Sequence, residues 1–252
     1  MKKTLKIMTV AAVLMFATSS SLMAQFKFGV KASGTLNNMF WSEDTATYME
    51  RHPVFGFNVG VMGEYFLGDN MSIGAELMFA QQGFRRTSEY NETSEYGKYH
   101  SENDLTFRTN HVNLPIVFRY YINGLAIEVG PQLSFCFGGK VKQIASYEYT
   151  YGGQTEIQSR DTTYYLADME KEEQDQLKKE GLKDFKFWNR INVGGTVGLC
   201  YNMENGLFFG ARYTYDFTNV FNSYEYKNEK PVKIDNYKSH YGVLSVSVGF
   251  KF

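Results

Sequence analysis

The 252-residue chain is poor in several residue types that would point to a familiar class of protein. It has two cysteines, four prolines and four histidines. Two cysteines cannot make a disulfide-rich scaffold, and no spacing matches a metal site, a phosphate-binding glycine loop or a nucleophile elbow. After residue 24 no run of about 18 apolar residues occurs, which excludes a membrane-spanning helix there. No cofactor, metal or catalytic residue is expected from these patterns.

The first 24 residues, 1–24, are predicted to be a cleaved signal peptide. Lys2, Lys3 and Lys6 form a basic start, and residues 7–16 are mostly apolar but too short to span a bilayer. Removing three lysines lowers the basic count from 26 to 23 against 27 acidic residues, a formal charge of −4. This balance does not favour a nucleic-acid partner. Residues 25–252 are predicted to form a single domain.

The last twelve residues, YGVLSVSVGFKF, alternate between an apolar side and a small, mostly polar side. A two-residue period of this kind predicts a β-strand with one apolar face. The same alternation predicts strands in eight segments, which are 26–33, 54–66, 71–84, 105–122, 125–137, 188–201, 207–217 and 241–252.

The connections between these strands alternate between long and short. Short turns are expected at 67–70, 123–124 and 203–206, and Asn123-Gly124 is the strongest hairpin signal. Long polar stretches cover 37–53, 85–104, 138–187 and 219–238, and a charged helix is expected at 168–179. An even strand number with alternating connections is typical of outer-membrane barrels. We therefore predict an all-β fold, an eight-stranded antiparallel up-and-down transmembrane β-barrel with long extracellular loops and both termini in the periplasm.

The distribution of charged residues predicts which face of each strand points out of the barrel. The apolar sides of the strands lack charge at their centres, whereas nearly every opposite side carries it. Such charges are costly to bury unpaired in a soluble barrel, but inside a narrow lumen they can pair. The 21 Phe and 19 Tyr fit aromatic girdles around a membrane barrel. The expected lumen charge network consists of Lys27, Lys31, Glu64, Glu76, Arg119, Glu128, Arg190, Arg212, Asp216 and Lys251.

Two other functions are left open by the sequence. A narrow channel would be lined by Arg119, Arg190 and Arg212. A lipid-A-modifying enzyme would need a His, a Ser and a carboxylate near the outer rim. The candidates for that site are His240 beside Ser239, together with His52, His100 and His111.

The register also makes predictions about cysteines and prolines. Cys136 and Cys200 are placed near opposite rims, about 20–30 Å apart at 3.3 Å per residue, which predicts two free thiols. Pro131 and Pro115 each remove a hydrogen bond from the sheet. A β-bulge or kink is therefore expected near Pro131.

The middle of the chain contains the segments VNLPIVFRYY (112–121), EVGPQLSF (128–135) and NVGGTVGLCYNMENGLFFGARYTYDFTNV (192–220). Together with FKFGVKASG at 26–34 and SVGFKF at the end, they resemble the PorT-like outer-membrane β-barrel family of Bacteroidetes-type bacteria. The resemblance implies a place among outer-membrane lipids and insertion by the barrel-assembly machinery, which would read the closing strand with Phe250 and Phe252. Some relatives take part in protein secretion. Two short segments resemble an O-glycosylation signal of such bacteria, Asp44-Thr45-Ala46 and Asp161-Thr162-Thr163.

Together these features favour a non-enzymatic barrel whose lumen is a scaffold. Its long, polar, Tyr-rich loops are expected to bind a protein or surface partner, or to shield the envelope.

Overall fold

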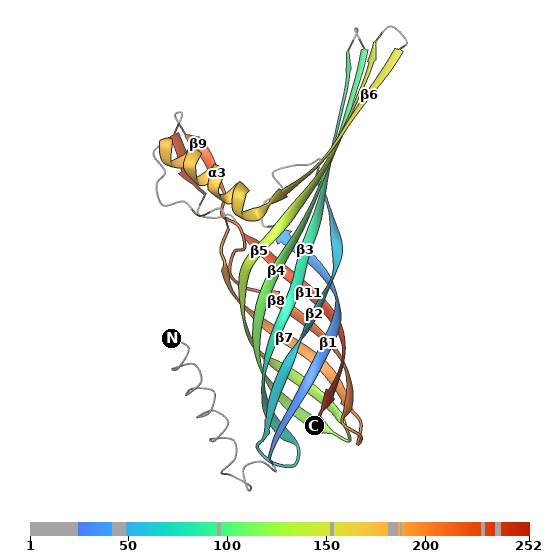
Figure 1. Cartoon of the computed structure of the whole chain (residues 1–252), viewed down its shortest axis with the longest axis vertical. Helices are drawn as coiled ribbons and strands as arrows, with labels where there is room; N and C mark the ends of the chain where they lie inside the picture. Colours follow the sequence, from blue (N-terminus) through green and yellow to red (C-terminus); the bar gives the residue numbers. More distant parts are fainter. Residues whose placement is uncertain are drawn as a thin grey trace, which may run out of the picture.

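The computed structural model describes residues 25–41, 49–94, 97–151, 154–180, 186, 188–227, 230–234 and 238–252. The expected signal peptide and Asp44-Thr45-Ala46 lie outside the described residues. The described chain forms a closed antiparallel barrel, from one end of which other parts project (Figure 1).

Eight strands form the ring, as predicted, and each pairs with its neighbours in chain order. The last of them closes the ring by pairing with the first over thirteen positions. In order around the ring the strands are β1 (Phe26–Trp41), β2 (Met49–Phe66), β3 (Met71–Ser94), β4 (Gly97–Ile122), β5 (Leu125–Tyr151), β7 (Ile191–Asn202), β8 (Leu207–Asp216) and β11 (Ser239–Lys251).

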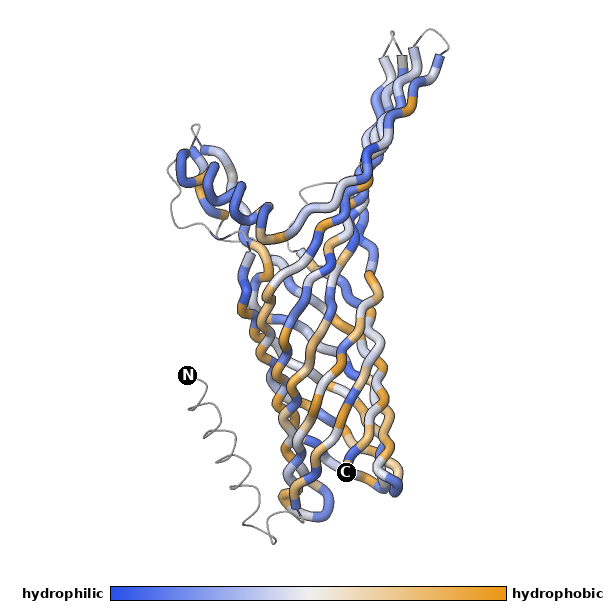
Figure 2. Tube along the Cα trace, in the orientation of Figure 1, coloured by the Kyte–Doolittle hydropathy of each residue, from blue (hydrophilic) through white to orange (hydrophobic). Residues whose placement is uncertain are grey.

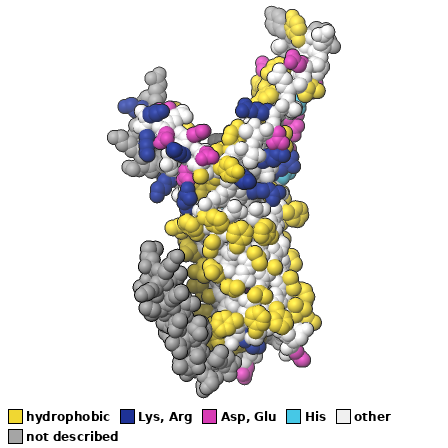
Figure 3. Space-filling model, in the orientation of Figure 1, with side chains coloured by type: hydrophobic (Ala, Val, Ile, Leu, Met, Phe, Trp, Pro, Cys, Tyr) yellow, Lys and Arg dark blue, Asp and Glu magenta, His cyan; other side chains and the backbone are white. Residues whose placement is uncertain are grey.

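The barrel wall has the predicted sense, with its apolar face outward. Along β3, Ile73 and Leu77 are exposed on the outside, whereas the residues directly before them, Ser72 and Glu76, are buried in the lumen. Figure 3 shows hydrophobic side chains spread over the barrel wall, with charged side chains gathered on the projecting parts and at the short turns. Inside and outside are therefore reversed relative to a soluble barrel.

The two ends of the barrel differ. At one end β1 begins, β11 ends and the short turns lie (Figure 1). Here Asn123 and Gly124 both have positive φ, 47° and 85°, as a two-residue type I′ hairpin turn requires. We call this the short-turn end and the other the long-connection end.

Much of the polar sequence expected to form loops is β-structure instead. β3 and β4 continue as a hairpin through 85–104, and β5 continues to Tyr151 before returning as β6 (Gln154–Tyr165). The backbone ladder continues although the hydrophobic alternation has stopped. We call the part beyond the barrel, residues 87–94, 97–104, 144–151 and β6, the projecting sheet; Figure 2 shows it as predominantly hydrophilic.

The rest of the long-connection end contains a helix and a small hairpin. The helix α3 (Leu166–Lys179) confirms the expected helix to within two residues, and it has Asp168 in its first turn and two lysines in its last. The hairpin β9 (Tyr224–Lys227) and β10 (Lys230–Lys233) lies beside α3 in Figure 1, within a stretch expected to be loop.

The prolines interrupt the ladder without shifting it. The pairing of β4 with β5 keeps one register from Ile122↔Leu125 past Pro131, and the pairs at Ile116–Pro131 and Val117–Gly130 are missing. The pairs opposite Pro115 on β3 are missing in the same way. Of the two features expected near Pro131, a bulge or a kink, the bulge is wrong: the register shift between β4 and β5 lies at Asn110/His111, near the barrel rim, where bulges commonly occur.

Candidate functional site

The centre of the lumen is built around Glu76 on β3. Arg212 binds it through two nitrogens, Nη1 at 2.9 Å from Oε2 and Nη2 at 2.8 Å from Oε1. Arg119 Nη2 lies 2.7 Å from Oε1, and Lys31 Nζ lies 3.2 Å from Oε2. All four side chains are at least nine-tenths buried. Three cations from β1, β4 and β8 thus converge on one carboxylate.

Two further carboxylates extend this arrangement. Glu128 on β5 accepts from Arg119 Nε at 3.1 Å and from Arg212 Nε at 2.7 Å. Glu64 on β2 lies 3.3 Å from Arg119 Nη1 and 2.6 Å from Lys251 Nζ. We call the connected set the lumen charge cluster; it comprises Lys31, Glu64, Glu76, Arg119, Glu128, Arg212 and Lys251.

This cluster reaches across the whole ring. Seven of the eight ring strands supply one member each, and β7 supplies Gly198, where a Cβ would lie 2.9 Å from Glu128 Oε1. On β3, a Cβ at Gly74 would collide with Arg119 Nη1. Glycine at these two positions leaves room for the large charged side chains. Removing one partner of such a buried group would leave an uncompensated charge, so the cluster has to be complete.

The structure brings together seven of the ten residues expected in the lumen network. Asp216 is also buried, but it lies four residues beyond Arg212 toward the long-connection end of β8. Lys27 is exposed at the short-turn end, with Nζ 5.2 Å from the centre of the Phe66 ring. Arg190 precedes β7 and forms a 2.7 Å ion pair with Glu170 of α3 outside the barrel. Lys27 lies within β1 but at its start at the short-turn end, and Arg190 lies one residue before β7 begins, so neither reaches the cluster.

Several polar partners of the cluster were missed from the sequence. Tyr121 and Ser72 both donate to Glu64 Oε1, and Asn202 Oδ1 accepts from Lys251 Nζ at 2.6 Å. Each lies on the lumen side of its strand, so the signal was present in the two-residue period. The expected lumen network consisted of charged residues alone, so these polar partners were not part of it.

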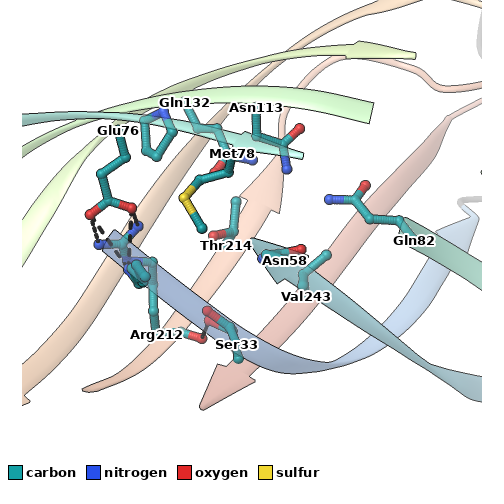
Figure 4. A pocket seen from close by; sticks show the side chains of 13 residues that line it. Ser33, Asn58, Glu76, Met78, Gln82, Asn113, Gln132, Arg212, Thr214 and Val243 are labelled. Atoms are coloured by element: carbon teal, nitrogen blue, oxygen red, sulfur yellow. Dashed lines mark hydrogen bonds and ion pairs between the residues drawn. The ribbon is translucent and has the colours of Figure 1, made fainter. Parts of the chain in front are cut away.

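Between the cluster and the long-connection end lies a small polar cavity of about 20 Å³ (Figure 4). Glu76 and Arg212 lie at one side of it and Gln82 and Val243 at the other. Its volume accommodates about one water molecule. Asn58 Oδ1 and Gln82 Oε1 are buried there without a protein partner, and such a water would satisfy them.

Further along, aromatic side chains fill the lumen. The Phe84 and Phe107 rings stack at 4.4 Å, and the Trp188 and Phe221 rings meet edge-on at 4.2 Å. Leu166 of α3 is buried in the same cluster. We call the buried cluster the aromatic plug; its members are Met39, Phe84, Cys136, Leu166, Trp188, Val220, Phe221, Tyr241 and Val243. The sequence did not reveal it, because Trp188, Val220 and Phe221 lie outside the periodic segments or at their ends.

The short-turn end has its own small apolar cluster of Met62, Ala126, Cys200 and Phe208, below which a shallow recess of about 620 Å³ opens. Cys136 and Cys200 are both free and belong to the clusters at opposite ends, which confirms the two predicted free thiols.

The four histidines do not converge. His111 is buried in the lumen, with Nδ1 3.1 Å from Ser134 Oγ and Nε2 2.8 Å from Thr109 Oγ1. The His240 ring lies tilted against Tyr215, with ring centres 5.6 Å apart, while Ser239 Oγ donates to the Phe221 carbonyl. Of the remaining two, His52 lies on β2 beside Glu50, and His100 lies in the projecting sheet beside Asn91.

Outside the barrel, two ion or hydrogen-bond pairs have shifted pKa values. The hydrogen bond from Arg85 to Asp104 raises the pKa of that guanidinium. The hydrogen bond from Tyr224 to Glu173, 2.5 Å long, raises the pKa of the phenol and ties β9 to α3. Tyr226 donates to Glu180 at 2.6 Å in the same way.

The other residues singled out in the sequence lie at the surface. Phe250 and Phe252 are exposed at the short-turn end, with ring centres 5.6 Å apart. Asp161-Thr162-Thr163 lies in β6 rather than in a loop. Among the described residues no group of three or more His, Cys, Asp or Glu side chains is placed to bind a metal ion. In the same part of the chain, no helix is long and apolar enough to cross a membrane.

Three solved structures are similar to this chain. Neisserial surface protein A is 13% identical with a TM-score of 0.41, and the match covers 89% of this chain and 97% of that one. Ail, the attachment invasion locus protein of Yersinia pestis, is 14% identical (TM-score 0.37; coverage 90% and 99%). OprG from Pseudomonas aeruginosa is 10% identical (TM-score 0.36; coverage 90% and 95%).

No curated protein matches the sequence significantly. Residues 16–222, however, match the family model described as an outer membrane protein beta-barrel domain. That match spans most of the strands of the ring. The chain therefore belongs to the outer membrane protein beta-barrel domain family and is a bacterial outer-membrane protein.

Proposed function

We propose that this protein is a non-enzymatic outer-membrane barrel that presents the projecting sheet and α3 to a partner outside the cell. In this arrangement the long-connection end is extracellular, both termini are periplasmic, and residues 1–24 are a cleaved export signal. Phe250 and Phe252 act in recognition by the barrel-assembly machinery. The PorT-like resemblance of residues 112–121 and 192–220 makes a secretion-related partner one of the classes to test.

One observation supports the proposal: side chains fill most of the lumen, whereas three strands continue beyond the barrel into the projecting sheet. The lumen charge cluster, the small polar cavity and the aromatic plug follow one another along the barrel axis. Strands β3, β4 and β5 continue beyond the plug into a sheet whose residues are mostly exposed or half-buried. Loops and extensions on rigid scaffolds are where binding residues concentrate. The scattered histidines likewise support a role without catalysis.

Replacing the projecting sheet tests this proposal. The register offers two clean joining points, because Arg86 pairs with Leu105 and Gln143 pairs with Thr162. Residues 87–104 and 144–161 would each be replaced by Asn-Gly, which keeps the barrel, the plug and α3. We expect the trimmed protein to shift on heating in a detergent gel as the full chain does, and to lose its cross-linked partners in intact cells. Unchanged partners would contradict the proposal.

Conductance measurements test the channel alternative. Because Arg190 lies outside the lumen and Arg119 and Arg212 are bound by carboxylates, we expect no resolved single-channel steps from the full chain in planar bilayers. The trimmed variant serves as the control for a path blocked by the extension. Reproducible steps from either protein would favour a channel.

A further inference from the structure

β6 is an edge strand that carries no lysine or proline. In the described part of the chain it pairs with β5 alone, and this ladder runs from Tyr151↔Gln154 to Lys140↔Tyr165 without a bulge. Its other side presents unpaired backbone donors and acceptors over twelve mostly exposed residues. Natural edges are commonly guarded by charged side chains, above all lysine, by proline, by a bulge or by short length. The β6 sequence QTEIQSRDTTYY is long and has neither lysine nor proline, and its charged residues are Glu156, Arg160 and Asp161, of both signs.

The opposite edge of the projecting sheet is different. Among the described residues β2 pairs with β3 as far as Met49↔Ser88, so β3 extends beyond β2 over residues 89–94. That edge is short and carries Glu89 and Glu92, two like charges. The open edge therefore belongs to β6.

The order of charges in β6 is complementary to itself. In an antiparallel pair of two β6 strands centred on Gln158, Glu156 of each copy lies opposite Arg160 of the other. Moving the register by one residue in one direction places Glu156 opposite Asp161, a like-charge pair. Moving it in the other direction places Glu156 opposite Ser159, which removes the ion pair. Opposite charges across a strand pair stabilise it and like charges destabilise it, so this register is favoured over its two neighbours.

We propose that β6 is a homotypic pairing edge, at which two copies of this protein join their projecting sheets into one continuous antiparallel sheet. The inference rests on the proposed function and names a second copy as the partner. Nine positions of each strand, 154–162, take part. The partner's Gln154 then lies opposite Thr162, short of Leu166 where α3 begins.

The geometry also fixes where the two copies are. Antiparallel pairing reverses the strand direction, so the two-fold axis is perpendicular to β6. The two barrels then lie at opposite ends of the joined sheet, as the projection of β6 from one end of the barrel in Figure 1 implies. Two barrels in the same membrane cannot satisfy this arrangement. The contact therefore forms between two membranes that face each other and would hold two cells together.

Vesicle tethering tests the pairing. Full-length protein would be reconstituted into two vesicle populations carrying different fluorescent lipids, with outward exposure of β6 checked by protease. We expect wild-type vesicles to tether. E156R or R160E in both populations should reduce tethering by about tenfold or more, because each creates two like-charge contacts and many copies act together. E148R, the same charge change on the neighbouring strand β5, is the matched control and should leave tethering intact.

Mixing the variants makes the test sharper. Vesicles with E156R facing vesicles with R160E restore both opposite-charge contacts, so tethering should return to near the wild-type level. A Q158C variant should form an intermolecular disulfide between vesicles, since this residue lies on the two-fold axis; E148C should not. Absence of wild-type tethering, normal tethering by the single variants, or failure of the mixture would each overturn the pairing. If tethering is absent while the trimmed protein still loses a cellular partner, the proposed function stands and self-pairing is wrong.

Discussion

β3, β4 and β5 each pass through two environments, and the same strands look different in each. Within the barrel, burial alternates strictly, as in Ile73 (44% exposed) beside Ser72 (0%). In the projecting sheet the alternation disappears, and Tyr90 and Asn91 are both exposed. The backbone ladder runs through both parts, with a gap opposite Pro115. Alternation therefore reports that one face meets lipid and the other a packed lumen, whereas strand formation depends on pairing partners.

The comparison predicts that stability is concentrated in the barrel. Glu76→Ala leaves Lys31, Arg119 and Arg212 without their shared partner and should destabilise the folded barrel by about 3–5 kcal/mol. Denaturant unfolding in lipid vesicles, followed by the heat-dependent gel shift, measures this. Glu89→Ala on the same strand in the projecting sheet is the matched control, and should stay within about 0.5 kcal/mol. Equal effects of the two would break the contrast between the regions.

Glycine substitutions sharpen it further. At Gly74 an added Cβ collides with Arg119 Nη1, which Glu64 and Glu76 hold in place, so Gly74→Ala should cost about 1–3 kcal/mol. Gly68→Ala, in a turn where a Cβ meets nothing within 4 Å, should change stability by about 0.5 kcal/mol or less. The same unfolding assay compares them. A large cost at Gly68 would mean that steric fit in the lumen is not the cause.

The α3 region should respond to alkaline pH. The bond from Tyr224 to Glu173 requires the protonated phenol, so the pKa of Tyr224 in the folded protein lies above its usual value near 10. Its contribution is present below about pH 10 and is lost as the pH rises through the folded pKa. Because both side chains are only partly buried, we expect less than about 1 kcal/mol. Protection factors of amides 224–227, which correct for the faster intrinsic exchange at high pH, should fall in the wild type as the pH rises, whereas Tyr224→Phe should show the lower protection already at neutral pH.

The smallest effect is expected at the base of the projecting sheet. Arg85 and Asp104 form an ion pair across β3 and β4, but the arginine is half exposed. Arg85→Ala should change barrel unfolding by about 0.5 kcal/mol or less. It should nevertheless increase local hydrogen exchange in 85–94. An effect on global unfolding as large as that of Glu76→Ala would show that the projecting sheet and the barrel unfold as one unit.

The same contrast explains what the sequence could predict. The ring of eight strands, the Asn123-Gly124 turn and α3 follow from periodicity and turn chemistry, because lipid demands an apolar face at every second residue. The continuation of β3 to Ser94 and of β5 to Tyr151 has no such signal, since each strand is held there by its neighbours. The seven clustered charges were accessible for the same reason as the ring. Lys27 and Arg190 were misplaced because they lie at the ends of the barrel wall, where lipid no longer requires an apolar face at every second residue.

Cys136 and Cys200 can report local opening at the two ends of the barrel. One sulfur is enclosed in the aromatic plug and the other in the cluster at the short-turn end. A thiol reagent can therefore modify each only when its own end loosens. The relative rates of alkylation at the two positions will show which end opens more readily, with no label introduced by mutation.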